Sequence, residues 1–236
     1  MELWHGQTKA IIDPIGAWLT NLSDDNGDVL FPTRLLKTAD GSQKKRGGMH
    51  VCLPNFGPGG DSGLEQHGFG RTSTWEVEEQ SDNSSTLTLK KEDGDYAGTE
   101  ATVTYTLGDR QLTAVLSITN NGVKPLRFAP GFHPYFTARG GHDGVRINGE
   151  KRKLDELGET EFIFGGQQEL SILGRHITLT SKDLTAWAIW TDLLGSYVCV
   201  EPTKEGYAFL KSTPGNDQVL APGAAKTYRF TIEWRS

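Results

Sequence analysis

Two runs of alternating residues constrain the fold of this chain more than any other feature. Residues 101–107 and 111–119 carry an apolar side chain at nearly every second position, with threonine at many of the positions between. This period-2 pattern is typical of half-buried antiparallel strands. The short Gly/Asp-containing segment 108–110 between the runs is a turn signal, so the pattern predicts a β-hairpin.

Shorter segments of similar character suggest that strands make up most of the chain. We expect them at 9–12, 17–22, 75–79, 86–90, 176–180, 184–190, 197–201, 207–211 and 226–234. No run shows a sustained apolar stripe with the 3.6-residue period of a helix, and 29 glycines among 236 residues disfavour long helices. The pattern therefore predicts an all-β sandwich or barrel. Because no linker or repeat divides the chain, we expect one domain over residues 1–236.

The charge balance limits the classes of partner. The chain has 24 Lys and Arg against 30 Asp and Glu, a formal net charge of −6. Such a chain has no global basic field for nucleic acid or an anionic membrane, although a local basic pocket is compatible with it. The N-terminus lacks an apolar signal core, and no window approaches 18 apolar residues. We therefore expect a cytoplasmic monomer without nucleic-acid or membrane partners.

The cysteines and histidines lack metal-site spacing. Cys52 and Cys199 are far apart, have no CxxC partner and lie in apolar runs, so we expect buried thiols rather than a disulfide or a zinc site. His50 and His67 are 17 positions apart, which is not a metal-ligand spacing. We expect no metal ion.

Three segments break the alternating pattern and mix glycine, proline, aromatic and ionisable residues: 44–60, 66–75 and 129–136. We expect them to be loops that carry the functional site. In the third, His133 lies among aromatic residues and is followed by Pro134, which favours an extended backbone at His133. An imidazole held in this way can exchange a proton near neutral pH. The alternative is a packed core histidine.

A carboxylate closes the apolar run at 197–200. Glu201 follows that run and precedes Pro202. A glutamate at the end of a buried strand is costly unless it is paired, and burial can raise its pKa into the range of a general base. The alternative is a strand-end glutamate that points into water.

Two arginines lie beside glycines, Arg46 before Gly47 and Arg71 after Gly70. Glycine permits the backbone to approach a ligand closely, and a guanidinium group matches phosphate or carboxylate. For Arg46, the alternative is a solvated basic turn that includes Lys44 and Lys45.

Taken together, four motifs resemble those of the hexose-6-phosphate 1-epimerases, within the aldose 1-epimerase superfamily. In chain order they are RGG followed by HVCLPNFGP, QHGFGR before a tryptophan, GFHPYF, and VCVEP. The resemblance extends through most of the chain, from the first hairpin to the closing LAPG and the strand after it.

The resemblance implies a large twisted antiparallel β-sandwich with a sugar cleft and a reaction that needs no metal or cofactor. The substrate would be a sugar or sugar phosphate, and the enzyme an isomerase that interconverts α and β anomers. Glu201 would be the general base at the O1 hydroxyl and His133 the general acid at the ring oxygen. His67 would orient the sugar, and Arg46 and Arg71 would contact a phosphate group.

The chain departs from the family pattern at two places. Glu161-Phe162 stands where Asp-Arg is usual, which leaves the role of that carboxylate open, and Met49-His50 stands where Ile-Pro is usual. We expect a hexose 6-phosphate, with glucose 6-phosphate as the default. The alternatives are a neutral or modified aldose as substrate, and a carbohydrate-binding module that does not catalyse.

Overall fold

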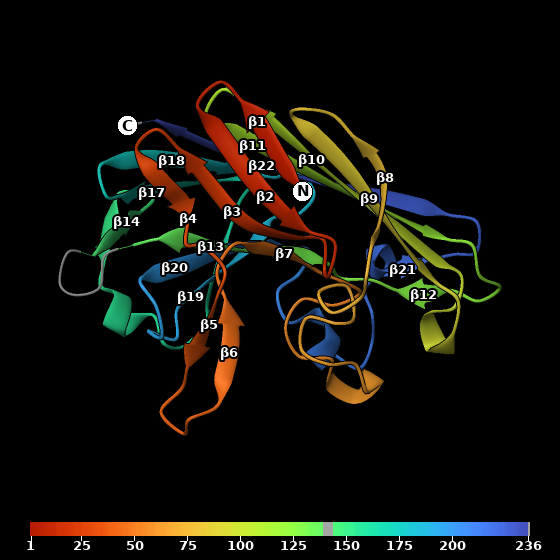
Figure 1. The fold of residues 1–236 in the computed structure, drawn as a ribbon. Helices are drawn as coiled ribbons and strands as arrows, with labels where there is room; N and C mark the ends of the chain where they lie inside the picture. The colour runs from red at the N-terminus through yellow and green to blue at the C-terminus, as the bar shows by residue number, and fades with distance from the viewer. Residues whose placement is uncertain (139–143, 236) are drawn as a thin grey trace.

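The computed structural model describes residues 1–138 and 144–235. Within them, two nine-stranded antiparallel sheets lie one behind the other (Figure 1). Along the first sheet the strands follow the order β1-β2-β3-β4-β13-β20-β19-β16. The remaining strand, β7, lies off this path and pairs with β13 and β3. The second sheet has the order β15-β14-β17-β18-β22-β11-β10-β9-β8. The all-β sandwich expected from the sequence is confirmed.

The strands of the first sheet are β1 (Glu2–His5), β2 (Thr8–Asp13), β3 (Trp18–Asp24), β4 (Gly27–Leu30), β7 (Met49–Cys52), β13 (Gly131–Thr137), β16 (Glu161–Phe164), β19 (Ala186–Trp190) and β20 (Tyr197–Thr203). Those of the second are β8 (Glu76–Gln80), β9 (Ser84–Lys91), β10 (Thr99–Gly108), β11 (Gln111–Asn120), β14 (Val145–Ile147), β15 (Glu150–Arg152), β17 (Gln167–Ile172), β18 (Arg175–Thr180) and β22 (Ala225–Arg235). Two small sheets pair β5 (Arg34–Lys37) with β6 (Gln43–Arg46), and β12 (Leu126–Arg127) with β21 (Val219–Leu220). Short 3-10 helices are η1 (Gly60–Ser62), η2 (Gly94–Tyr96), η3 (Leu154–Glu156), η4 (Ala208–Leu210) and η5 (Asn216–Gln218).

The predicted hairpin forms as β10 and β11. The two strands pair antiparallel from Thr99 with Asn120 to Gly108 with Gln111, and buried residues alternate with partly exposed ones along both. The apolar half of each alternation packs into the core between the sheets. Period-2 patterning therefore located these strands because only one face of each is buried.

The core between the sheets is filled from both sides. Phe132 and Trp187 of the first sheet contact Phe230 of the second, with ring centroids 5.7 and 5.9 Å apart. In β7, β13, β19 and β20, alternate residues point into this core and the others point to the outer face of the first sheet. That outer face carries the candidate site.

The prediction of a strand at 207–211 was wrong. Ala208 and Phe209 are buried within the 3-10 turn η4, and the Arg127 guanidinium lies 4.5 Å from the Phe209 ring centre. The apolar side chains of this segment are therefore buried by a turn that packs against its surroundings, without a partner strand.

Two of the three segments expected as loops also contain strands. Most of segment 129–136 belongs to the central strand β13, and segment 44–60 includes the whole of β7. Both faces of these strands are covered, so their apolar residues do not alternate with polar ones and the period-2 signal is lost.

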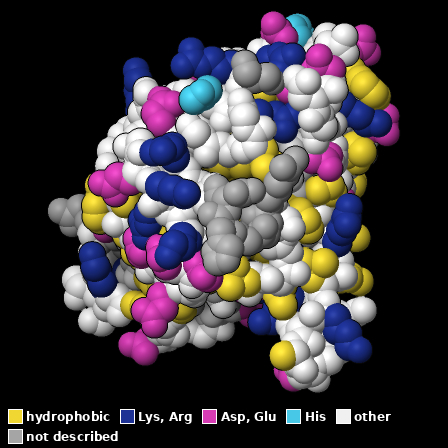
Figure 2. Space-filling view, turned by 90° about the vertical axis from the view of Figure 1, so that its left-hand side faces the viewer, with side chains coloured by type: hydrophobic (Ala, Val, Ile, Leu, Met, Phe, Trp, Pro, Cys, Tyr) yellow, Lys and Arg dark blue, Asp and Glu magenta, His cyan; other side chains and the backbone are white. Residues whose placement is uncertain are grey.

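Charged side chains of both signs are interspersed on the face of the molecule shown in Figure 2. Across residues 1–138 and 144–235, no helix combines the length and hydropathy needed to cross a membrane. Cys52 and Cys199 are both buried free thiols, as expected.

Candidate active site

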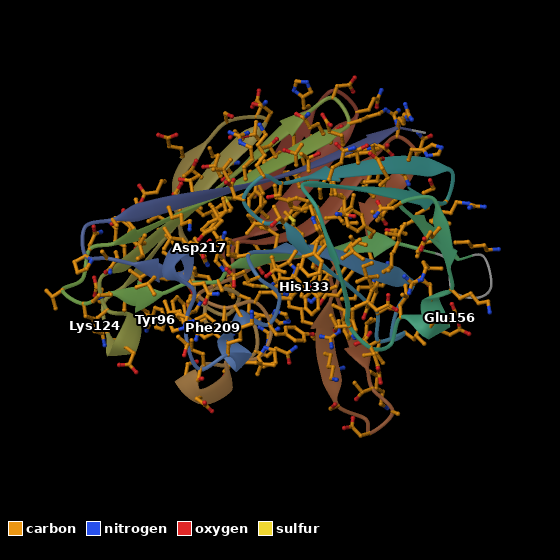
Figure 3. All side chains as sticks on the ribbon, turned by 180° about the vertical axis from the view of Figure 1, so that it is seen from behind. Tyr96, Lys124, His133, Glu156, Phe209 and Asp217 are labelled. Atoms are coloured by element: carbon orange, nitrogen blue, oxygen red, sulfur yellow. The ribbon has the colours of Figure 1, made fainter. Side chains whose placement is uncertain are left out.

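Strand register brings distant residues into one row on the outer face of the first sheet. His50 of β7 lies opposite His133 of β13, and Ala188 of β19 lies opposite Glu201 of β20. The β13–β20 pairs Gly131 with Thr203 and Tyr135 with Cys199 place His133 beside Glu201. The row therefore runs His50, His133, Glu201, Ala188 across four neighbouring strands, and His133 lies near the middle of the molecule (Figure 3).

His133 and Glu201 form a buried pair. Nε2 of His133 lies 3.3 Å from Oε2 of Glu201, and the two side chains are 5% and 3% exposed. Burial raises the pKa of the Glu201 carboxyl well above its usual value, against the opposing effect of Arg46. Burial, followed by the neighbouring histidines and arginines, lowers the pKa of His133 well below 6.5. Both shifts favour the neutral forms, in which the pair holds one transferable proton, on Glu201.

The ring of His133 is held on several sides. It stacks on Tyr135 at 4.6 Å between centroids and contacts the rings of His50 at 4.8 Å and His67 at 5.0 Å. Both of the alternatives considered from sequence are therefore partly correct in geometry: His133 is packed among aromatic rings, yet it also lines a cavity beside a carboxyl group. Glu201 does not point into bulk water, because it is 2% exposed.

His67 is a neutral hydrogen-bond donor. Its Nδ1 accepts the backbone N–H of Gly57 at 3.1 Å and lies 3.3 Å from the Cys52 sulfur. With Nδ1 occupied as an acceptor, the proton resides on Nε2. Burial, assisted by Arg71 and Arg46, lowers the pKa of His67 to about 3, so the ring stays uncharged at neutral pH.

The two arginines differ in their partners. Nε of Arg46 donates to Oδ2 of Asp192 at 2.8 Å, and Nη1 donates to the Lys45 carbonyl at 3.1 Å. Asp192 also accepts a short hydrogen bond from the Tyr197 hydroxyl. Arg71 has no ion-pair partner among the described residues, and its Nε is buried without a hydrogen bond. Arg46 is therefore charge-neutralised, whereas the charge of Arg71 is available to a ligand.

One cavity of about 480 Å³ is lined by all five residues expected from sequence: Arg46, His67, Arg71, His133 and Glu201. Its volume lies within the range of about 300–1,000 Å³ typical of small-molecule sites. Sequence reasoning missed Thr160, Trp190 and Tyr207, which also line it. Trp190 ends the apolar strand β19 two residues before Asp192, and a carboxylate after an apolar run is the signal that identified Glu201.

The glycines near the arginines serve a different purpose from the one expected. A Cβ on Gly68 would lie 2.2 Å from the Leu53 carbonyl oxygen, and one on Gly48 would lie 2.1 Å from that of Leu19. These glycines approach the protein's own backbone rather than open space for a ligand. They permit the tight turns that fix His67 and Arg46, and His67 itself has a φ of +64°.

The Gly68→Ala variant is expected to lose about 1–3 kcal/mol of unfolding free energy or more, because it combines a φ of +65° with a backbone clash. Urea unfolding measures the loss. Gly63→Ala is the matched control, since Gly63 has a φ of +70° in the same loop but open space within 4 Å of where a Cβ would lie. Equal losses in the two variants would show that the Leu53 contact has no effect.

Glu161 does not belong to this cavity. It lies on the edge strand β16, 44% exposed, and its carboxylate pairs with Arg152 at 2.6 Å. Its neighbour Phe162 instead packs its ring against Tyr207, with centroids 5.1 Å apart. The Tyr207 hydroxyl donates to Thr160 at 2.8 Å, so a hydroxyl pair occupies this wall of the cavity.

One cluster has the donor atoms of a metal site. Ligand atoms of His133, Cys199 and Glu201 lie within 4.8 Å of one another, all buried. Two of the three already form the carboxyl–imidazole pair, and the unpaired guanidinium of Arg71 in the same cavity adds positive charge that opposes a dication. The donor set is therefore a poor match for a divalent cation.

Comparisons with known proteins agree with this fold. A candidate glucose-6-phosphate 1-epimerase from Cenchrus ciliaris is 27% identical over 137 residues, which are 51% of this chain. The chain spans 41% of the length of that relative. A candidate aldose 1-epimerase from Escherichia coli K12 has the same fold, with a TM-score of 0.82, 18% identity and coverage of 99% and 98% of the two chains.

A galactose mutarotase-like protein from Lactobacillus casei gives a TM-score of 0.80 at 20% identity, covering 100% of this chain and 99% of its own. At these identities, both structures show the fold alone. The family-level evidence is the sequence model described as aldose 1-epimerase, which matches residues 1–165, a stretch that includes His67, Arg71 and His133. The chain therefore belongs to the aldose 1-epimerase family.

Proposed function

We propose that this protein interconverts the α and β anomers of a hexose 6-phosphate, with glucose 6-phosphate as the first substrate to test. The observation that carries the proposal is the buried His133–Glu201 pair, 3.3 Å apart, in a cavity that it shares with the unpaired guanidinium of Arg71. The name of the Cenchrus ciliaris relative supports the choice of substrate.

Ring opening needs one proton removed from the O1 hydroxyl and one delivered to the ring oxygen O5. The neutral His133–Glu201 pair holds one transferable proton that can be delivered, and Glu201 can then accept the other. Transfer of that proton from Glu201 to His133 across their contact leaves a carboxylate beside an imidazolium. Glu201 then accepts the proton of the O1 hydroxyl while His133 Nε2 protonates the ring oxygen O5. The C1–O5 bond breaks and C1 becomes the aldehyde carbon. Rotation about C1–C2 and reversal of the two transfers close the ring with the other configuration.

The remaining residues bind and orient the sugar. His67 offers its Nε2–H as a fixed neutral donor, and Trp190 and Tyr207 provide aromatic walls. Arg71, whose charge is unpaired, contacts the phosphate directly. Arg46, oriented by Asp192, presents its remaining N–H groups to the same cavity.

The Arg71→Met variant is expected to raise KM for glucose 6-phosphate by about 10- to 100-fold, the effect of losing a hydrogen bond to a charged group. KM for glucose should change little, because the neutral sugar makes no such bond. Exchange NMR of the α and β anomers measures both rates against the uncatalysed background. Arg146→Met, an exposed arginine on β14 outside the cavity, is the matched control.

A neutral aldose is the second candidate substrate, and the pairing of Arg46 with Asp192 favours it because that pairing removes one cationic charge from the cavity. Equal kcat/KM for glucose and glucose 6-phosphate, with no effect of Arg71→Met, would select it. Absence of exchange with every aldose tested would leave a carbohydrate-binding role.

A further inference from the structure

A third histidine, His50, continues the row of the candidate catalytic pair on the side of His133 away from Glu201. It lies directly opposite His133 in the β7–β13 pairing, with ring centroids 4.8 Å apart and ring planes tilted by 31°. On its other side, the ring of Trp18 lies 4.5 Å away. His50 is 0% exposed and does not line the cavity, so it does not contact a bound sugar.

Two nitrogens in this stack lack partners. Nδ1 of His133 and Nε2 of His50 are both buried without a hydrogen bond among the described residues. A buried polar group without a partner is destabilising, whereas an apolar ring at the same place would not be. Nδ1 of His50 has a long contact, 3.9 Å, with the Cys52 sulfur, and the His50 ring also interacts with the Val51 backbone. Packing alone therefore does not account for a histidine at position 50.

The Nδ1 atom of His133 needs an acceptor during the reaction. Nε2 of His133 faces Glu201, so a proton gained or lost there leaves Nδ1–H as a donor in both protonation states. When His133 is an imidazolium, that donor carries part of the positive charge and requires an acceptor, as in other catalytic histidines.

The other rings that contact His133 cannot supply this acceptor nitrogen. The indole of Trp190 is a donor only. The acceptor nitrogen of His67 is already taken by the Gly57 N–H. Nε2 of His50 is the remaining ring nitrogen that is unoccupied.

We propose that His50 is a positioning residue whose Nε2 accepts the Nδ1–H of His133 during the reaction and so orients the imidazole ring. The proposal rests on the proposed acid–base function. It makes His50 the third member of a chain of groups, Glu201, His133 and His50, of which only the first two touch the substrate.

The test compares two substitutions of His50, one that keeps an aromatic ring without the acceptor nitrogen and one that keeps a hydrogen-bond acceptor without the ring. His50→Phe keeps an aromatic ring and removes the acceptor, and is expected to lower kcat about tenfold or more with KM within twofold of wild type. The thermal midpoint should rise at the same time, because an unpartnered buried nitrogen is removed. His50→Gln keeps an acceptor without the ring, and its kcat should lie within threefold of wild type.

Val51→Ala is the matched control. Val51 lies on the same strand, is equally buried and faces the opposite side, into the core. Its substitution should lower the thermal midpoint and leave kcat unchanged, the reverse of His50→Phe. A His50→Phe enzyme with kcat within threefold of wild type, or a His50→Gln enzyme as slow as His50→Phe, would overturn the proposal.

A second readout is independent of turnover. In protein labelled with ¹⁵N-histidine, the Nδ1–H proton of His133 is expected at a downfield shift with slow solvent exchange at neutral pH, where the fold is intact and Nδ1 carries a proton. That signal should be lost in His50→Phe and retained in His50→Gln. If the wild type exchanges the anomers of no sugar, the proposed function fails, and this spectrum still decides the role of His50. An unchanged signal in His50→Phe would refute it.

Discussion

The Glu201→Gln variant is expected to exchange anomers about 10²–10⁴-fold more slowly than the wild type, with KM little changed. The amide preserves the size of the side chain but cannot accept the O1 proton or share one with His133. Because burial raises the pKa of Glu201 and favours its neutral form, a neutral amide of the same size should be tolerated and the fold retained. Exchange NMR at saturating sugar measures the rate, and thermal unfolding checks the fold.

Glu161→Gln is the matched carboxylate control. Glu161 lies on the edge strand β16 of the same sheet, outside the cavity, and its substitution removes a partly exposed pair with Arg152. Exchange in this variant should equal that of the wild type. A Glu201→Gln enzyme within tenfold of wild type, or a Glu161→Gln enzyme as slow as Glu201→Gln, would assign the general base elsewhere.

The second large expected effect is a loss of stability in mild acid. His50, His67 and His133 are buried with lowered pKa values, so below about pH 6.5 the unfolded chain binds three protons that the native protein does not. Glu201, whose pKa is raised, gives up one proton on unfolding above about pH 4.5. Among these four groups, unfolding in mild acid therefore takes up more protons than it releases.

Stability should accordingly fall as the pH falls below about 6.5, by about 1 kcal/mol per pH unit for each net proton that unfolding takes up. The sign follows because the unfolded state binds more protons in this window. Urea unfolding at several pH values measures the slope.

Single substitutions measure how much each histidine contributes to this dependence of the unfolding free energy on pH. His50→Phe should remove one of the three histidine contributions and make the slope shallower by about 1 kcal/mol per pH unit. His5→Gln, at an exposed histidine of β1 remote from the cluster, should leave the slope unchanged. A wild-type stability that stays constant from pH 7 to pH 5 would mean that the three histidines titrate in the native protein.

The local patterns predicted some parts of the molecule well and others poorly. The β10–β11 hairpin was visible because one face of each strand is buried and the other is not. Strand β13 was not visible, because the core covers Phe132 and Phe136 on one face while the site covers His133 and Tyr135 on the other. Segment 207–211 was misassigned because its apolar residues pack in a 3-10 turn.

The site shows the same division. His133 and Glu201 were recognisable one at a time, since each is an ionisable group in apolar surroundings, and the family resemblance linked them. Their 3.3 Å contact depends on the β13–β20 register, which no local pattern encodes. Asp192, which neutralises Arg46 across 146 positions of sequence, was not recognised at all.

By itself, the sequence determined that this chain is an all-β protein with a net acidic charge, two buried thiols and a small set of ionisable residues suited to proton transfer. These features follow from residue periodicity and composition, which act locally. Only the tertiary structure decided that His50 joins the row of His133 and Glu201, that Arg71 rather than Arg46 keeps an unpaired charge, and that Glu161 lies outside the cavity. The physical reason is that pairing register and burial are set by contacts between strands far apart in the chain, and those contacts determine both which charges meet and which protons they hold.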